Sequence, residues 1–249
     1  MLKSWNFTHE EALWHLDKKE MTELNYCIFK DIDSQELGLF MEQCPEKISP
    51  KRRDETFTVP GRHGNLTTTD GAFETYIRSA EFIVKNEEKI DEICAHFKGT
   101  GWLIFSSETD RKYKARVANQ IEFSHIIRHL KRFVVEFEVQ PFGYEVLPQK
   151  IVKTKAFSLF NNGTFNSEPV ITIFGTGNIT LYVNNQSVVL AGVSDKVVID
   201  SEMQNAYSGS ISMNNKMYGN FPTFASGENS ISWTGNVTKV EIQPNWRWL

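Results

Sequence analysis

A strict alternation of apolar and polar residues constrains this chain more than any other feature. In "RFVVEFEVQPFGY", Phe133, Val135, Phe137 and Val139 fall on one side, and Pro141 is expected to end the segment. Because successive side chains of a β-strand point to opposite faces, this period of two predicts a strand with one buried face. The segment "KYKARVANQIEF" repeats the pattern at Tyr113, Ala115, Val117, Ile121 and Phe123. Further strands are predicted at residues 55–59, 73–84 and, fully buried, 102–105.

One helix is expected among these strands, in "NEEKIDEICAHFKGTG". Asn86 is its predicted N-cap and Gly99 its stop. Its apolar face is formed by Ile90, Ile93, Cys94 and Phe97. A shorter helix is expected in "THEEALWHLDKKEM", where Thr8 and Glu11 fit a capping box. Met21 then opens a strand-like segment and also fits a second initiation site, which would make the first 20 residues an appended arm.

A change in composition divides the chain near residue 146. Residues 1–145 hold 20 basic and 25 acidic groups, a balance of −5, whereas the remainder holds seven and six, a balance of +1. This second part is rich in Asn, Ser, Thr and Gly, and turn residues recur between short strands, as in a β-sandwich. "NITLYVNNQSVVL" predicts a hairpin with Asn184 and Asn185 at its bend. The predicted parts are an arm (1–25), a β domain with one packed helix (26–148) and a β-sandwich (149–249).

Several functions are disfavoured by what the sequence contains. No apolar run approaches the roughly 18 residues that span a bilayer, and the charged N-terminus does not read as a signal peptide. Cys27, Cys44 and Cys94 are odd in number and lack a CxxC spacing, which favours reduced thiols. Neither part has the basic excess of a nucleic-acid binder. No catalytic, metal or cofactor residues are assigned, and the chain is not expected to be an enzyme.

The segment "HIIRHLKR" has two interpretations for each of its features. His125 and His129 would share one face of a helix and could bind a metal, but a metalloprotease motif has a glutamate where Ile126 stands. The alternative is a solvated turn. The basic residues 128–132 are either a phosphate-binding patch or charges that protect an exposed strand edge, and the edge is preferred.

The C-terminal tryptophans also have two interpretations. Trp233, Trp246 and Trp248 would form a sugar-stacking platform if their indole faces were exposed. They would otherwise cap the core of the sandwich, which is preferred because large aromatic side chains are usually buried.

The chain resembles the distal tail proteins of long-tailed siphophages and their prophages. The resemblance rests on "ELGLF" with "VPGRHGNL...DGAF", "VEFEVQPFGY", "FNNGTFNSEPVITIFGTGNITLYVNN" and "VVIDSEMQNAY...MYGNFPTFASGENSISWTGNVTKVEIQPNWRWL", in this order from about residue 37 to the C-terminus. It implies a ring-forming domain related to tail-tube proteins, followed by a galectin-like β-sandwich. Residues 146–249 contain no histidine, so the galectin sugar-binding set is not found and an attachment scaffold is favoured over a lectin.

The resemblance implies a structural virion protein that forms a homo-hexameric hub at the distal end of the tail. Its expected partners are the tail-tube protein, the tail-associated tip protein and receptor-binding or other baseplate proteins. It would assemble in the host bacterial cytoplasm, with no membrane insertion. DNA would pass through the lumen without specific binding, past acidic groups of the first domain. The alternative function is a carbohydrate-binding adhesin that acts in host attachment.

The glycine-rich stretch "TVPGRHGNLTTTDG" gains an interpretation from this resemblance. A loop made rigid by Pro60 and freed at Gly61 and Gly64 would place Arg62 against a neighbouring subunit, since the guanidinium fork fixes direction. The alternative is a hairpin turn within one chain, with Arg62 in solvent.

Overall fold

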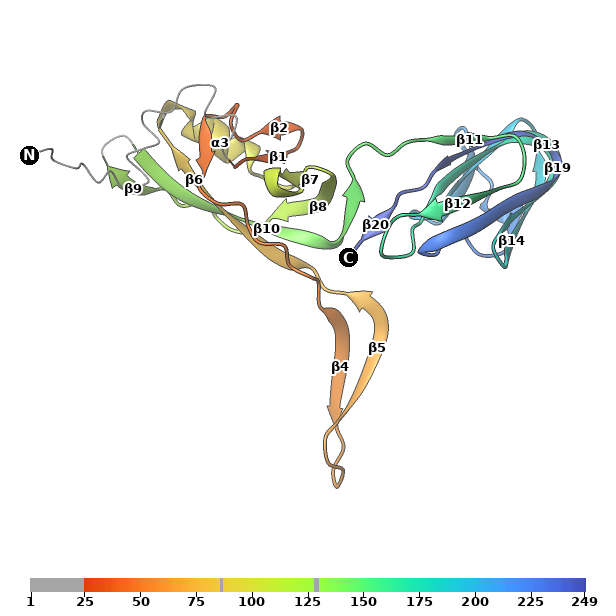
Figure 1. Cartoon of the computed structure of the whole chain (residues 1–249), viewed down its shortest axis with the longest axis horizontal. Coiled ribbons are helices and arrows are strands. Elements are labelled where there is room, and N and C mark those ends of the chain that lie inside the picture. Colours follow the sequence, from red (N-terminus) through yellow and green to blue (C-terminus); the bar gives the residue numbers. More distant parts are fainter. Residues whose placement is uncertain (1–24, 86, 128–129) are drawn as a thin grey trace, which may run out of the picture. The chain divides into compact units, whose positions relative to one another are not determined.

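A computed structural model describes residues 25–249, apart from Asn86, Arg128 and His129. The predicted N-terminal helix, Met21 and the Asn86 cap therefore lie outside the described residues. The chain forms two compact units (Figure 1). The first holds the described residues up to Thr109 and Tyr113–Gln140, and the second holds Asp110–Lys112 and Pro141–Leu249. The longer segment of the second unit starts at Pro141. The prediction of a mainly β protein with one packed helix is confirmed.

The first unit is built on an antiparallel sheet. Its strands in spatial order are β2 (Ile32–Asp33), β1 (Cys27–Phe29), β7 (Thr100–Phe105), β8 (Arg111–Val117), β10 (Leu130–Glu145), β6 (Tyr76–Val84) and β3 (Leu39–Met41), and β9 (Ser124–Ile127) also pairs with β10. The 3₁₀ turn η2 (Glu87–Lys89) leads into the helix α3 (Ile90–His96), and η3 (Ser106–Glu108) follows β7.

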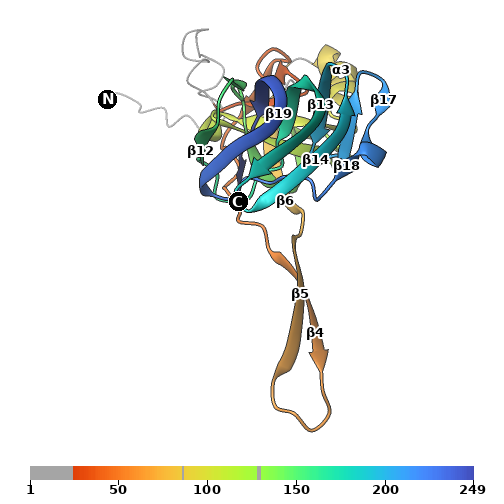
Figure 2. The same ribbon diagram turned by 90° about the vertical axis from the view of Figure 1, so that its right-hand side faces the viewer.

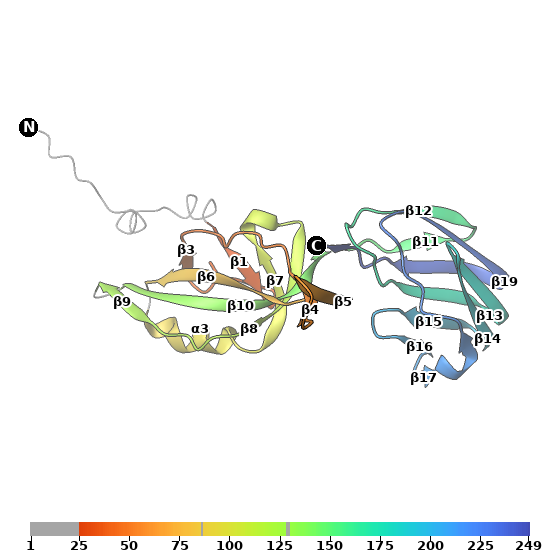
Figure 3. The ribbon, with the colours of Figure 1, turned by 90° about the horizontal axis from the view of Figure 1, so that it is seen from below.

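The helix α3 lies along the sheet of the first unit (Figure 3), and aromatic side chains join the two. Phe97, directly after α3, lies within 6.3 Å of the ring centroids of Phe29, Phe82, Phe133 and Phe137. Ile93 is buried with them, so the predicted apolar face of the helix is the one that covers the core. The helix is shorter than the sequence predicted, because its first turn is the 3₁₀ turn η2.

The alternation that opened the sequence analysis is confirmed in β10. Phe133, Val135, Phe137 and Val139 are all buried in the core of the first unit. Pro141 does not end the strand, which continues to Glu145. Its missing N–H costs little where no ladder donor is needed. The compact units divide at this proline instead.

The second alternating segment ends earlier as a strand than its pattern suggests. Tyr113 and Ala115 are buried in β8, which stops at Val117. Beyond it, Asn119 donates a hydrogen bond to the Val134 carbonyl (2.9 Å) and accepts one from the Glu136 N–H (2.8 Å). The Asn119 side chain thus makes two hydrogen bonds to the backbone of β10, beyond the point where strand β8 has ended. Ile121 and Phe123 nevertheless pack against the core, as the alternation predicted.

The second unit is a sandwich whose two layers share the long strands β13 and β19. Its strands are β11 (Ile151–Lys153), β12 (Phe157–Asn161), β13 (Val170–Val183), β14 (Gln186–Val193), β15 (Lys196–Asp200), β16 (Asn205–Ser208), β17 (Ile211–Ser212), β18 (Met217–Tyr218), β19 (Gly227–Gln243) and β20 (Arg247–Trp248), with the 3₁₀ turn η4 (Asn214–Lys216). The predicted connector 146–156 therefore contains a short strand, β11, paired with β19.

Each shared strand changes neighbours along its length. Residues 170–174 of β13 pair with β15, whereas residues 179–183 pair with β14 (Figure 2). The register shifts between these halves, where Gly235 of β19 lies so close to β13 that a Cβ would meet the Asn178 carbonyl oxygen at 2.5 Å. Glycine is needed there because two backbones approach directly. The predicted bend at Asn184 is confirmed, with φ at 53°.

Candidate subunit interface

A two-stranded ribbon extends from the first unit. Its strands, β4 (Arg52–Thr58) and β5 (Asn65–Phe73), pair with each other, and no other described strand pairs with them (Figures 1 and 2). Every residue from Lys51 to Gly71 is exposed. The sequence analysis treated residues 58–71 as a loop, and this is corrected: only residues 59–64 form the turn. The Thr-rich run 67–69 suits a strand because β-branched residues favour extended backbone.

The two faces of the ribbon differ in chemistry. Phe57 lies directly opposite Leu66, so both side chains share one face, and Val59 follows two residues later. These three side chains are 48%, 42% and 39% exposed. The other face carries the pairs Thr56–Thr67 and Thr58–Asn65. The outer half of the ribbon is therefore amphipathic, and its apolar side chains are exposed among the described residues.

The four residues predicted as an interface loop form the tip of the ribbon. The Arg62 N–H donates to the Val59 carbonyl (3.1 Å), which closes a turn with Pro60 and Gly61 at its centre. Gly61 has φ of 80°, the value that the third residue of such a turn requires. Gly64 also has positive φ, and Arg62 is exposed. The hairpin turn is thus present within one chain, and a contact with a neighbour stays a prediction.

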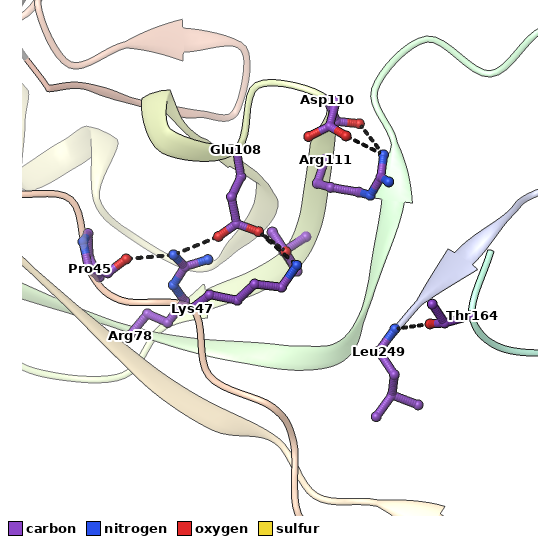
Figure 4. A network of polar contacts seen from close by, with 9 residues as sticks. Pro45, Lys47, Arg78, Glu108, Asp110, Arg111, Thr164 and Leu249 are labelled. Carbon is purple, nitrogen blue, oxygen red and sulfur yellow. Dashed lines mark hydrogen bonds and ion pairs between the residues drawn. The ribbon is translucent and has the colours of Figure 1, made fainter. Parts of the chain in front are cut away.

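A buried arginine lies where the chain enters and leaves the ribbon (Figure 4). Arg78, in β6, is 1% exposed. Its Nη2 donates to the Pro45 carbonyl (2.7 Å), which precedes β4, and lies 3.0 Å from Glu108 Oε1. The guanidinium carbon lies 4.3 Å from the ring centroid of Phe105. These contacts hold the segment that precedes β4 against β6, the strand that follows the ribbon.

Glu108 is shared by three partners. Besides Arg78, Lys47 Nζ lies 3.5 Å away, and the Tyr113 hydroxyl donates a hydrogen bond at 2.6 Å. Partial burial alone raises the pKa of Glu108, but the Tyr113 hydrogen bond and the charges of Arg78 and Lys47 outweigh it and hold the pKa below its usual range. Burial and the bond to Glu108 raise the pKa of Tyr113.

The sequence analysis did not single out Arg78. In "FETYIRSAEFIV", Arg78 is separated from Ala80 and Phe82 by an even number of positions, so all three point to the same face of the strand. Ala80 and Phe82 are buried. An arginine on the core side of an alternating strand is a signal for a buried, paired charge, because such a charge is rarely buried otherwise.

The face of the sheet opposite the core carries a hollow of about 420 Å³. It is lined by Thr100, Gly101, Trp102, Lys114, Ala115, Arg116, Glu138 and Gln140. The Lys114 ammonium lies 5.6 Å from the Trp102 ring centroid. Arg116 Nε donates to Glu138 (2.6 Å), which also accepts from the Thr75 hydroxyl (2.9 Å). The sequence analysis predicted "WLIF" as wholly buried, and this is corrected: Leu103 and Phe105 face the core, and Trp102 faces the hollow.

The histidine and basic residues do not form a ligand site in the described residues. His125 lies in strand β9, not in a helix, and His129 lies outside the described residues. Arg132 lies in β10 and forms an ion pair with Glu81 of β6 (2.7 Å). At this point β10 has β6 on one side and β9 on the other. The preferred interpretation, an exposed strand edge, is therefore wrong for Arg132. Within residues 25–249 as described, no group of three or more His, Cys, Asp or Glu side chains is placed to hold a metal ion.

The three tryptophans all contact the core of the second unit. Trp246 is 6% exposed, and Trp233 and Trp248 are partly buried against the same cluster. The guanidinium of Arg111 lies 3.6 Å from the Trp248 ring centroid. This placement corresponds to the core-capping interpretation rather than to an open stacking platform.

The first unit contains the region that a family model matches. Residues 32–139 match the family model described as the phage tail protein RIFT-related domain. None of the helices in the described part of the chain has the length and apolar character needed to cross a membrane. No curated protein sequence matches the chain significantly.

The fold of most of the chain is similar to one solved distal tail protein. The crystal structure of SPP1 Dit (gp 19.1), titled "a Paradigm of Hub Adsorption Apparatus in Gram-positive Infecting Phages", matches with a TM-score of 0.73 and 12% sequence identity. The match covers 91% of this chain and 100% of that one. The resemblance to siphophage distal tail proteins, drawn from the sequence between about residue 37 and the C-terminus, is confirmed.

Proposed function

We propose that this chain forms the hub at the distal end of a long non-contractile phage tail, as a homo-hexameric ring. The first unit makes the ring and the second unit projects as an attachment scaffold. The ring joins the tail-tube protein to the tail-associated tip protein and to receptor-binding or other baseplate proteins. The protein is a virion component assembled in the host bacterial cytoplasm, and the proposal assigns it no catalytic activity.

One observation carries this proposal: a phage tail domain presents a fully exposed, amphipathic ribbon. An isolated two-stranded hairpin is at best marginally stable in water, so a ribbon of this kind gains stability when another surface covers it. A ring subunit needs such an element, because each copy must hold its neighbour in one orientation for the ring to close. Arg62 at the tip supplies a directional contact.

The charge balance supports a lumen that lets DNA pass. The chain carries −4, so a hexamer would carry 6 × −4 = −24. Residues 1–145, which contain the first unit, hold 25 acidic and 20 basic groups, so we expect acidic side chains of this unit to line the lumen. Basic surfaces hold DNA through counterion release, and an acidic lining avoids this. We expect no gel shift with duplex DNA at physiological salt.

Negative-stain electron microscopy of the purified protein tests the proposal most simply. Rings of uniform size, with a hexamer mass by sedimentation, are expected alone or after addition of the tail-tip partners. Monomers under every condition, including with those partners, would count against a hub.

A further inference from the structure

The apolar face of the ribbon and the Trp102 hollow have complementary shapes and chemistry. We propose that the ribbon of one copy packs its Phe57 and Leu66 side chains into the hollow of the next copy, head to tail. This contact rests on the proposed ring, and it names the two surfaces that would form each subunit boundary.

The ribbon supplies the inserting side. Phe57 and Leu66 form a cross-strand pair near the tip and remain almost half exposed. Covering these side chains would stabilise an interface, because removal of apolar surface from water is favourable. The opposite face, with Thr56 and Thr67, is suited to remain in contact with water.

The hollow supplies the receiving side. The Trp102 indole and the side-chain stems of Lys114 and Arg116 offer apolar surface, and Arg116 is neutralised by Glu138. An indole wall with a few polar groups at the rim is the usual lining of a pocket that takes an apolar anchor. A volume of about 420 Å³ accommodates a phenylalanine and a leucine side chain together.

Charge fixes the direction of the ribbon in the hollow. Residues 56–69 contain Arg62 and no acidic residue. Glu136 lies on the same face of β10 as Glu138, opposite Ser79, and no ion pair is formed by its carboxylate in the described structure. Arg62 of the inserted tip would pair with this carboxylate in a bidentate geometry that lysine cannot supply.

The position of the hollow requires that the ribbon come from another copy. Thr75, just beyond the root of the ribbon, hydrogen-bonds to Glu138 at the rim of the hollow. Leu66 is separated from the root at Phe73 by seven residues of strand, or about 24 Å. The tip cannot fold back to its own hollow while β4 and β5 remain paired. Two different surfaces on each copy make a heterologous contact, which closes into a ring or continues as a filament.

Mixing two assembly-defective variants tests this contact. Phe57→Asp/Leu66→Asp destroys the inserting face, and Trp102→Asp destroys the hollow. Each variant alone should be monomeric by native mass spectrometry. An equimolar mixture should form dimers with one copy of each and nothing larger, because one intact ribbon meets one intact hollow. Thr56→Asp/Thr67→Asp, on the opposite face of the ribbon, is the matched control and should still assemble.

Each outcome decides between the contact and the ring. Rings formed by either variant alone, or a mixture that stays monomeric, would overturn the contact while wild-type rings leave the hub intact. Wild-type monomers under every condition would overturn both. If Trp102→Asp does not fold, Arg62→Glu should raise the concentration needed for assembly about tenfold or more, and Glu136→Arg should restore it. Failure of that restoration would also reject the contact.

Discussion

The ribbon β4–β5 and the hairpin β13–β14 are built from the same local chemistry but differ in their surroundings. Both place a positive-φ residue in the turn, Gly61 in one and Asn184 in the other. In β13–β14, Leu181 and Val188 lie directly opposite each other and are buried in the sandwich. In the ribbon, the corresponding apolar pair Phe57–Leu66 is open to solvent. Turn and strand chemistry therefore produce a hairpin in either place, and only the rest of the molecule determines whether it is covered.

This difference indicates where the free energy of assembly comes from. The hairpin β13–β14 buries its apolar side chains within one chain, whereas the apolar side chains of the ribbon remain exposed. The contacts of Arg78 attach the root of the ribbon, where the chain enters and leaves it, to the first unit. These contacts do not involve residues at the tip. In the proposed ring, the fold and the assembly would therefore owe their stability to different parts of the first unit.

The largest effect is expected at the root of the ribbon. Arg78→Met leaves Glu108 partly buried without its main cationic partner, and should lower the free energy of unfolding by about 3 kcal/mol or more. Arg53→Met removes the exposed pair with Asp70 further along the ribbon and should lower the free energy of unfolding far less than Arg78→Met does. Urea denaturation of dilute protein measures both. Similar losses for the two variants would show that the root does not depend on the buried network.

The two hairpins should next differ in their response to truncation. Leu181→Ala opens a cavity in the core of the sandwich and should cost about 2–5 kcal/mol. Leu66→Ala should change the stability of the dilute chain by no more than about 0.5 kcal/mol, since the side chain is exposed. Equal losses in urea would mean that the ribbon is already covered within the single chain.

The turns offer a smaller comparison. Asn184 donates to the Asn229 side chain (2.8 Å) and accepts from the Ser230 N–H (2.9 Å), besides adopting positive φ. Asn184→Ala should therefore cost about 2 kcal/mol in thermal unfolding. Gly61→Ala strains a turn at the exposed tip of the ribbon, and should leave the melting temperature of the dilute chain almost unchanged. A melting temperature lowered equally by both changes would argue against an independent tip.

The smallest effect is expected from pH. Because the folded chain holds the pKa of Glu108 below its ordinary value of 4.5, the stabilisation is fully present above that value and is lost as pH falls through the depressed pKa. Wild type should thus lose more stability between pH 7 and pH 4 than Glu108→Gln does. Parallel pH profiles in urea denaturation would show that Glu108 is not held in this way.

The sequence predicts those features whose cause is local. The alternation in β10, the apolar face of α3 and the bend at Asn184 all follow from residue spacing and turn chemistry. It missed β5, because a run of threonines carries no apolar signal when both faces are exposed. It also misjudged Pro141, since the tolerance of a strand for proline depends on which neighbour pairs there. The Trp102 hollow depends on the spatial order β7–β8–β10, which no local pattern encodes.

Hydrogen–deuterium exchange of the wild-type protein and the monomeric Phe57→Asp/Leu66→Asp variant tests the central claim most directly. The claim is that the ribbon is uncovered in one chain and covered by the next in the ring. Amides of residues 54–69 should exchange rapidly in the monomer and at least about tenfold more slowly in the ring, whereas those of β13–β14 should be slow in both. Equally rapid exchange of the ribbon in assembled rings would contradict the account.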